Sequence, residues 1–168
     1  ASLAALADAL DAPANVVVQQ RVASVVPAGE LTPAAVGDVI SALLPEQTIL
    51  VDEGITCGLE LFTRTVGAAP HDWLSITGGS IGHGLPVSLG ASIACPQRKV
   101  VAFQADGSAM YTVQTLWSMM REETDVTVVL MNNSSYAILN IELRRLKTGE
   151  PTPKTLSMLD LSNPDIDW

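Results

Sequence analysis

The chain is short of basic side chains, cysteines and long apolar runs, and each shortage narrows the functions open to it. Its 168 residues hold 9 Lys and Arg against 18 Asp and Glu. This balance argues against nucleic acid as a partner, since such surfaces need clustered positive charge. No apolar run approaches the roughly 20 residues of a membrane-spanning helix, so we expect no membrane partner. Two cysteines, Cys57 and Cys95, are too few for a disulfide framework and predict a cytoplasmic setting.

What the chain does hold is a globular composition, with 48% hydrophobic and 16% charged residues. An amphipathic stretch over residues 2–10 is followed by a segment that contains Pro13 and Pro27. We therefore expect residues 1–30 to be the end of a preceding domain and a linker. Residues 31–168 are expected to form one domain, incomplete at its C-terminus because no closing element precedes Trp168.

Apolar runs alternate with helical patterns along the middle of the chain. Thr32 followed by Pro33 is a typical helix start. We expect short buried strands over residues 47–51, 73–76, 99–104 and 126–131. We expect further helices over residues 57–65, 85–94, 109–122 and 136–146, and a loop after residue 147. Such alternation predicts an α/β fold, a doubly wound and mostly parallel sheet with helices on both faces.

Two polar motifs each follow one of the expected strands. Asp106-Gly107-Ser108 comes after the run 100–103, and Asn132-Asn133 comes after the run 126–131. Taken singly, each motif is ordinary turn composition. In an open parallel sheet, however, ligands bind beyond the carboxyl ends of the strands. Asp and Asn oxygens placed there can hold a hard cation, which can in turn hold a diphosphate.

The stretch from Asp106 to Asn133 resembles the signature of thiamin-diphosphate-dependent enzymes, which opens with Gly-Asp-Gly-Ser and closes with Asn-Asn. The wider stretch 51–146 is similar to the decarboxylase and acetolactate synthase superfamily, including its glycine-rich segment at 78–86. Within that superfamily, benzoylformate decarboxylase and the acetolactate-synthase-like proteins look most similar. Ala105 departs from the first Gly of the signature, and the Gln-Trp pair of true acetohydroxyacid synthases is not evident in residues 139–142.

The resemblance implies thiamin diphosphate and Mg²⁺ as cofactors. It implies metal ligation by the side chains of Asp106 and Asn133 and by the backbone carbonyl of Ser135, with diphosphate oxygens and water completing six-coordination. It also implies that the Gly79 carbonyl accepts a hydrogen bond from the pyrimidine amino group, and that Ile81 holds the cofactor bent. The full set of expected cofactor contacts is Gly54, Thr56, Gly79, Ile81, Gly107, Ser108 and Tyr136.

The function that this resemblance implies is the diphosphate- and Mg²⁺-binding domain of an enzyme that decarboxylates or ligates 2-oxo acids. Such enzymes are homo-oligomers, dimers or tetramers, and their activating glutamate belongs to a pyrimidine-binding domain that this chain lacks. We therefore expect the chain alone to be inactive. His83 has either a structural or a catalytic role. Two alternatives stay open: a carboligase or lyase of the benzaldehyde lyase type, and a non-catalytic nucleotide-binding or interaction domain of the same fold.

Overall fold

A four-stranded parallel sheet forms the centre of the protein. The computed structural model describes residues 2–22, 24–146 and 149–168. The strands stand in the order β2-β1-β3-β4. Their bounds are β1 Ile49–Glu53, β2 Asp72–Ser75, β3 Val100–Ala105 and β4 Val126–Met131. The expected parallel α/β sheet is thereby confirmed, and the bounds of β4 are those that the sequence predicts.

The strand register brings the carboxyl ends of the strands to one edge of the sheet. Ile49 pairs with Val100, and Val100 pairs with Val126. In the same register Glu53 lies beside Gln104. The segments that leave β1, β3 and β4 therefore start side by side at this edge.

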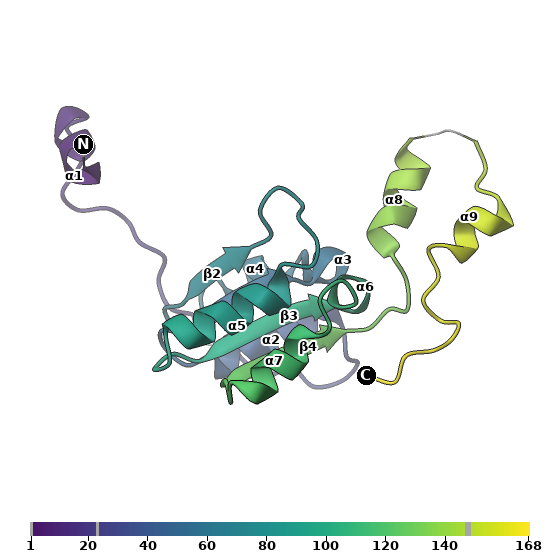
Figure 1. Ribbon diagram of the computed structural model, residues 1–168. Helices are drawn as coiled ribbons and strands as arrows, with labels where there is room; N and C mark the ends of the chain where they lie inside the picture. The colour runs from purple at the N-terminus through teal and green to yellow at the C-terminus, as the bar shows by residue number, and fades with distance from the viewer. Residues whose placement is uncertain (1, 23, 147–148) are drawn as a thin grey trace.

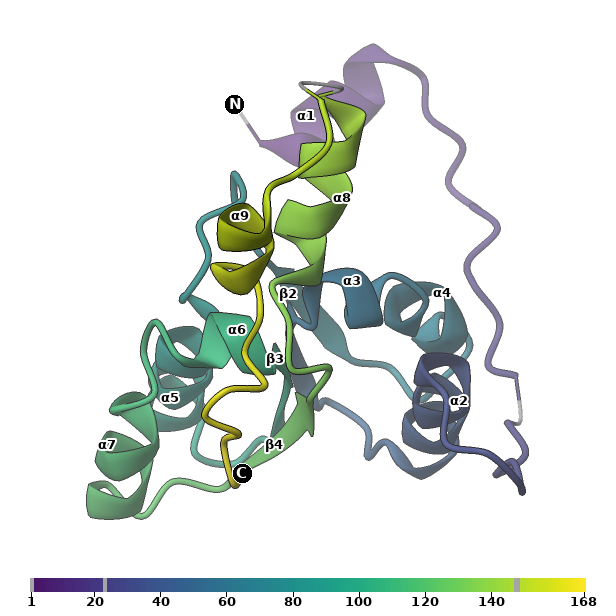
Figure 2. The same ribbon diagram turned by 90° about the vertical axis from the view of Figure 1, so that its right-hand side faces the viewer.

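Helices cover both faces of the sheet (Figure 2). One face carries α2 (Pro33–Leu43) and α4 (Leu61–Thr65), and the other carries α5 (Gly84–Ala94) and α7 (Thr115–Arg121). As predicted, Thr32 caps the start of α2, and its hydroxyl accepts the N–H of Ala35 at 3.1 Å. The observed layers therefore match the doubly wound arrangement.

The core follows the alternation of side chains along the strands. Leu50, Val101 and Phe103 point to the α2/α4 face, while Val51 and Val100 point to the α5 face. Phe103 has no solvent exposure, and its ring centroid lies 5.9 Å from that of Trp73. The central strands β1 and β3 are thus buried on both faces, and this fixes the edge from which the functional loops emerge.

The two chain ends lie outside these layers (Figure 1). The N-terminal helix α1 (Leu3–Ala9) stands apart on an extended segment, and no residue of it is buried. Beyond β4 come α8 (Ala137–Arg145) and α9 (Pro153–Ser157). Among the residues that the structure describes, no helix is both long and apolar enough to cross a membrane.

The helix expected over residues 109–122 is wrong in its first half. The structure has a single turn, α6 (Asp106–Ala109), then a series of tight turns, and only then α7. The turns are held from outside, because the Thr112 hydroxyl donates to the Gly82 carbonyl at 3.0 Å. Thr112 and Val113 are also β-branched, which lowers their helix propensity. A tertiary contact therefore overrides the helical spacing.

The loop expected after residue 147 is also corrected. Residues 147–148 lie outside the described residues, and beyond them α9 begins at Pro153. Thr152 caps this helix by accepting the N–H of Thr155 at 3.1 Å. Thr152-Pro153 repeats the Thr32-Pro33 pattern, so the sequence carried a signal for this helix.

Candidate functional site

The strand order creates a crevice between the loops that follow β1 and β3. The chain leaves β1 toward β2 on one side, while β3 lies on the other side of β1. The connection after β1, which begins with α3 (Ile55–Gly58), therefore runs to one face, and α6 and α7 run to the other. Such a switch in strand order is where open α/β sheets bind their ligands.

A pocket of about 470 Å³ of empty space lies at this crevice. Three loops converge on it, one each from the ends of β1, β3 and β4, together with the glycine-rich loop. Eight of the predicted site residues line it: Thr56, Ile81, Asp106, Gly107, Ser108, Asn133, Ser135 and Tyr136. Residues up to 80 positions apart in sequence are thus brought to one place, as the strand-end motifs predict.

Asp106 is the acidic group of this pocket. It directly follows the last residue of β3 and is 2% exposed. Its Oδ1 is buried, and the described residues offer that oxygen no hydrogen-bond partner. Because buried carboxylate oxygens are nearly always paired, this one fits a site for a cation. Within the described residues no three or more His, Cys, Asp or Glu side chains are grouped to hold a metal. A cation here would therefore depend on amide, carbonyl and phosphate oxygens as its further ligands.

The turn after β4 presents Asn133 and Ser135 to the same pocket. The Asn133 side-chain oxygen accepts the N–H of Ser135 at 3.1 Å, and the nitrogen of that side chain lies 3.7 Å from the Cys57 thiol sulfur. An antiparallel bridge pairs Ser135 with Asp160. The hydrogen bonds of this bridge use the carbonyl of Ser134 and the N–H of Tyr136. The bridge therefore makes no use of the Ser135 carbonyl. The C-terminal segment thus holds the turn in place.

The Ser108 side chain is engaged by other groups of the protein. Its hydroxyl lies 2.6 Å from the Gln104 amide nitrogen, from which it accepts, and 3.0 Å from the Ala105 carbonyl. The hydroxyl is therefore engaged within the protein, which leaves backbone N–H groups as the donors that α6 can offer to an anion. With four residues, α6 is a single turn and has only a small dipole.

The glycine-rich loop owes its shape to left-handed backbone. Gly79 and Gly82 have φ values of +70° and +97°, which L side chains rarely adopt. The Gly79 carbonyl accepts the N–H of Ile81 at 3.0 Å and keeps a second lone pair. Ile81 is 36% exposed and stands between the pocket and a second cavity. His83 ends this loop, and its buried Nε2 has no partner among the described residues.

Gly54, the remaining expected contact, lies at the start of α3 and lines neither cavity. Its N–H already donates to Asp52 Oδ1 at 3.0 Å. The residue that sequence reasoning missed is its neighbour Glu53, which is 1% exposed and accepts N–H groups from the glycine-rich loop. An acid at a strand end was visible in the sequence, but its partners were not.

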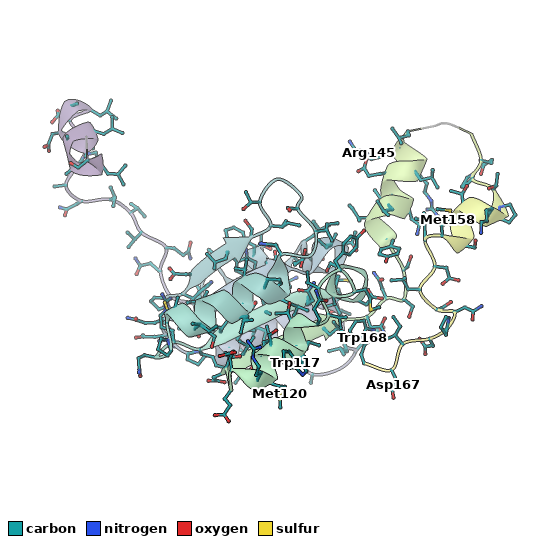
Figure 3. All side chains as sticks on the ribbon, viewed as in Figure 1. Trp117, Met120, Arg145, Met158, Asp167 and Trp168 are labelled. Carbon is teal, nitrogen blue, oxygen red and sulfur yellow. The ribbon has the colours of Figure 1, made fainter. Side chains whose placement is uncertain are left out.

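The second cavity holds about 1410 Å³ of empty space and adjoins the first. Thr56 and Ile81 line both, and Gly79 lines this one. Apolar side chains dominate its wall: Ile55, Leu59, Phe62, Ile76, Ile138, Leu139 and Ile141. Glu142 and Arg145, both on α8, also line this cavity and form an ion pair at 2.8 Å. Figure 3 labels Arg145, which lies at the C-terminal end of α8.

Known proteins are similar to this chain in sequence and in fold. The family described as "Thiamine pyrophosphate enzyme, C-terminal TPP binding domain" matches residues 60–167. A Mycobacterium tuberculosis protein that bears the name of an acetolactate synthase large subunit, IlvX, is 49% identical over 96% of this chain and 33% of its own length. Benzoylformate decarboxylase of Pseudomonas aeruginosa is 33% identical over 66% of this chain and 21% of its own.

A solved structure agrees with these relatives. The thiamine diphosphate-dependent 4-hydroxybenzoylformate decarboxylase of Rhodococcus jostii RHA1 superposes with a TM-score of 0.66 and 28% identity, covering 92% of this chain and 28% of that one. The chain thus spans about a third of the length of the curated relative IlvX. From the family match over residues 60–167, the chain belongs to the C-terminal thiamin-diphosphate-binding domains of the thiamin-diphosphate-dependent enzymes.

Proposed function

We propose that the chain is the diphosphate- and Mg²⁺-binding domain of an enzyme that decarboxylates or ligates 2-oxo acids. The observation that carries this proposal is the buried, unpartnered Oδ1 of Asp106 at the carboxyl end of β3. When bound, thiamin diphosphate supplies the carbanion-stabilising centre that such reactions need. The residues of this chain would bind that group and orient it.

The metal part of the site consists of oxygen ligands. Asp106 and Asn133 would contribute side chains and Ser135 its backbone carbonyl, and all three residues line the pocket. Mg²⁺ prefers such hard oxygens and keeps phosphate and water oxygens in its shell. The net charge of −9 repels a diphosphate at long range. A cation is therefore the element that makes diphosphate binding favourable here.

The organic part of the cofactor would be held by the remaining pocket residues. Thr56 would offer a hydroxyl to the cofactor. At Gly107 the cofactor could come close to the backbone, beside the ring of Tyr136. Gly79 and Ile81 stand where the pocket meets the second cavity. That cavity is largely apolar, so it suits a 2-oxo acid with an apolar side chain.

The names of the relatives support a 2-oxo acid substrate, because IlvX bears an acetolactate synthase name and two others are decarboxylases of benzoylformate type. Since those proteins are three to five times as long as the matched portion, the substrate pocket would be completed by other parts of a longer protein. We propose a homo-oligomer, dimer or tetramer, as its working form.

Calorimetric titration of the 168-residue chain tests the cofactor site directly. We expect saturable binding of thiamin diphosphate in the presence of Mg²⁺, and none when EDTA removes the cation. ATP and NAD should bind more weakly under the same conditions. Preference for ATP or NAD would instead favour a nucleotide-binding domain of the same fold.

The variant Asp106→Ala tests the residue that carries the proposal. It should abolish Mg²⁺-dependent binding while the circular dichroism spectrum stays that of the parent. Asp8→Ala, which makes the same change on the exposed helix α1, should leave binding unchanged. Unaltered cofactor affinity in Asp106→Ala would overturn the assignment of this site.

A further inference from the structure

Glu53 is a buried carboxylate at the centre of the site that none of the assigned roles uses. It is the last residue of β1 and is 1% exposed. Its side chain points to the α5 face of the sheet, as does Val51 two residues earlier. Burying a carboxylate is costly unless hydrogen bonds replace its hydration. The hydrogen-bond donors to Glu53 therefore identify the segment that this side chain holds in place.

Those partners are N–H groups, and three of them are backbone N–H groups at the end of the glycine-rich loop and at the first residue of α5. Glu53 Oε1 accepts the backbone N–H of Gly82 at 2.5 Å and that of His83 at 3.3 Å. Its Oε2 accepts the backbone N–H of Gly84 at 2.7 Å and the side-chain amide of Gln104 at 3.0 Å. Both oxygens therefore act as acceptors, and the three backbone donors lie 29 to 31 residues further along the chain.

The fit between the loop and this carboxylate also depends on Gly84, which has no side chain. A Cβ on Gly84 would come within 2.7 Å of Glu53 Oε2 and 2.5 Å of Gln104 Oε1. A side chain at this position would therefore push the loop away from β1. Loop and carboxylate fit only when residue 84 is glycine.

We propose that Glu53 is a positioning residue, which fixes the glycine-rich loop over the crevice and thereby sets the places of Gly79 and Ile81 at the cofactor. This inference rests on the proposed function for its cofactor part. The chain between Ile81 and Gly84 is short, so anchoring the N–H groups of Gly82 to Gly84 restricts where Ile81 can lie. Glu53 acts through this loop, without lining the pocket of Asp106 itself.

The chemistry of the anchor requires a carboxylate. Glutamine has the same shape but carries one acceptor oxygen and one NH₂ donor. In Glu53→Gln, either orientation of the amide would place NH₂ against a backbone N–H, that of Gly82 or that of Gly84. A buried donor facing a donor leaves both unsatisfied, so this isosteric change should release the loop.

The diphosphate side should be spared by the same change. The Gln104 amide nitrogen also donates to the Ser108 hydroxyl at 2.6 Å, and this bond does not involve Glu53. Asp106, Asn133 and Ser135 make none of the contacts to Glu53. Glu53→Gln should therefore weaken binding of thiamin diphosphate more than binding of pyrophosphate, which lacks the rings.

Amide hydrogen exchange measured by NMR on the 168-residue chain tests the loop without any ligand. In Glu53→Gln the amides of Gly82, His83 and Gly84 should exchange roughly ten- to a hundredfold faster, the range for loss of charge-assisted hydrogen bonds. Glu60→Gln, the same change at an exposed site, should leave these rates unchanged. Unchanged loop rates in Glu53→Gln would overturn the proposal.

A second pair of variants approaches the same contact from the loop side, in case Glu53→Gln unfolds and all sheet amides lose protection. Gly84→Ala should speed exchange at Gly82 and His83 with Glu53 intact. Gly90→Ala lies in the same helix, where a Cβ meets no atom within 4 Å, and should not. Equal loop protection in the two alanine variants would contradict the anchor.

Calorimetry with Mg²⁺ then tests the cofactor part. We expect Glu53→Gln to lower affinity for thiamin diphosphate about tenfold, the effect of roughly one hydrogen bond, with pyrophosphate affinity unchanged. Equal losses for both ligands would overturn the separation of the two sides. If the parent chain binds neither ligand, the proposed function and the cofactor part fail together, and the exchange rates still decide whether Glu53 holds the loop.

Discussion

The aromatic ring of Tyr136 lies directly against Gly107. A Cβ on Gly107 would come within 2.8 Å of Tyr136 Cδ1 and 2.9 Å of its Cε1. This contact joins the turn after β3 to the turn after β4, the two segments that carry Asp106 and Asn133. The spacing of the proposed metal ligands thus depends on a glycine beside an aromatic ring.

Gly107→Ala should separate these two turns. The added methyl group would push the Tyr136 ring outward, and overpacking of this kind costs about 1–3 kcal/mol. We expect a lower urea midpoint and loss of Mg²⁺-dependent cofactor binding, measured by denaturation and calorimetry. Adding Tyr136→Ala to this variant restores space and should recover part of the stability. Full binding by Gly107→Ala alone would show that the contact does not set the site.

The phenol of Tyr136 should titrate later than an ordinary tyrosine. Its pKa is raised above 10.0 by burial first, then by Tyr111 and by the charge of Asp106. Since the folded pKa exceeds the unfolded one, the stability that this group contributes is present below pH 10 and is lost as the pH rises through the folded pKa. Ultraviolet titration of tyrosinate checks this, because the chain has two tyrosines. The difference between the titrations of the parent and of Tyr136→Phe isolates the Tyr136 phenol, and a difference centred at or below pH 10.0 would contradict the raised pKa.

Asp52 should lower the stability of the protein at neutral pH. Its pKa is raised chiefly by burial and further by the charge of Glu53, against the N–H of Gly54 and the charge of His83, which lower it. The native state therefore binds the proton more tightly than the unfolded state, and the unfolding free energy falls as the pH rises through the two pKa values.

Asp52→Asn keeps an acceptor for the Gly54 N–H and removes the charge. We expect a higher urea midpoint than the parent at neutral pH. The difference should shrink as the pH falls below the ordinary value of 3.8, where both states of the parent are protonated. A gain that persists unchanged at low pH would point to packing rather than charge.

The 168-residue chain should release no CO₂ from pyruvate or benzoylformate, even when loaded with thiamin diphosphate and Mg²⁺. Its relatives are three to five times as long as the portion it matches, and the resemblance to the family implies an activating glutamate in a separate pyrimidine-binding domain. A coupled CO₂ assay, with Pseudomonas aeruginosa benzoylformate decarboxylase as the positive control, measures this. Turnover by the purified chain would show that one domain suffices.

Local patterns in the sequence determined the strands, most helix starts and the order of the strand-end motifs. The bounds of β4 and the cap of α2 were predictable because side-chain alternation and Thr-Pro caps act over a few residues. The carboxyl ends of parallel strands meet at one edge, so Asp106 and Asn133 were expected at one place, and one pocket holds both.

Only the tertiary structure decided which groups those segments contact. The partners of Glu53 lie 29 to 51 residues away in the chain, the Ser108 hydroxyl turns to Gln104, and Thr112 leaves the helical path to reach Gly82. The C-terminal segment likewise pairs with Ser135 across 25 residues. The periodicity of apolar residues in the sequence predicts whether a side chain is buried. The identity of its hydrogen-bond partner depends on how loops from different strands pack together.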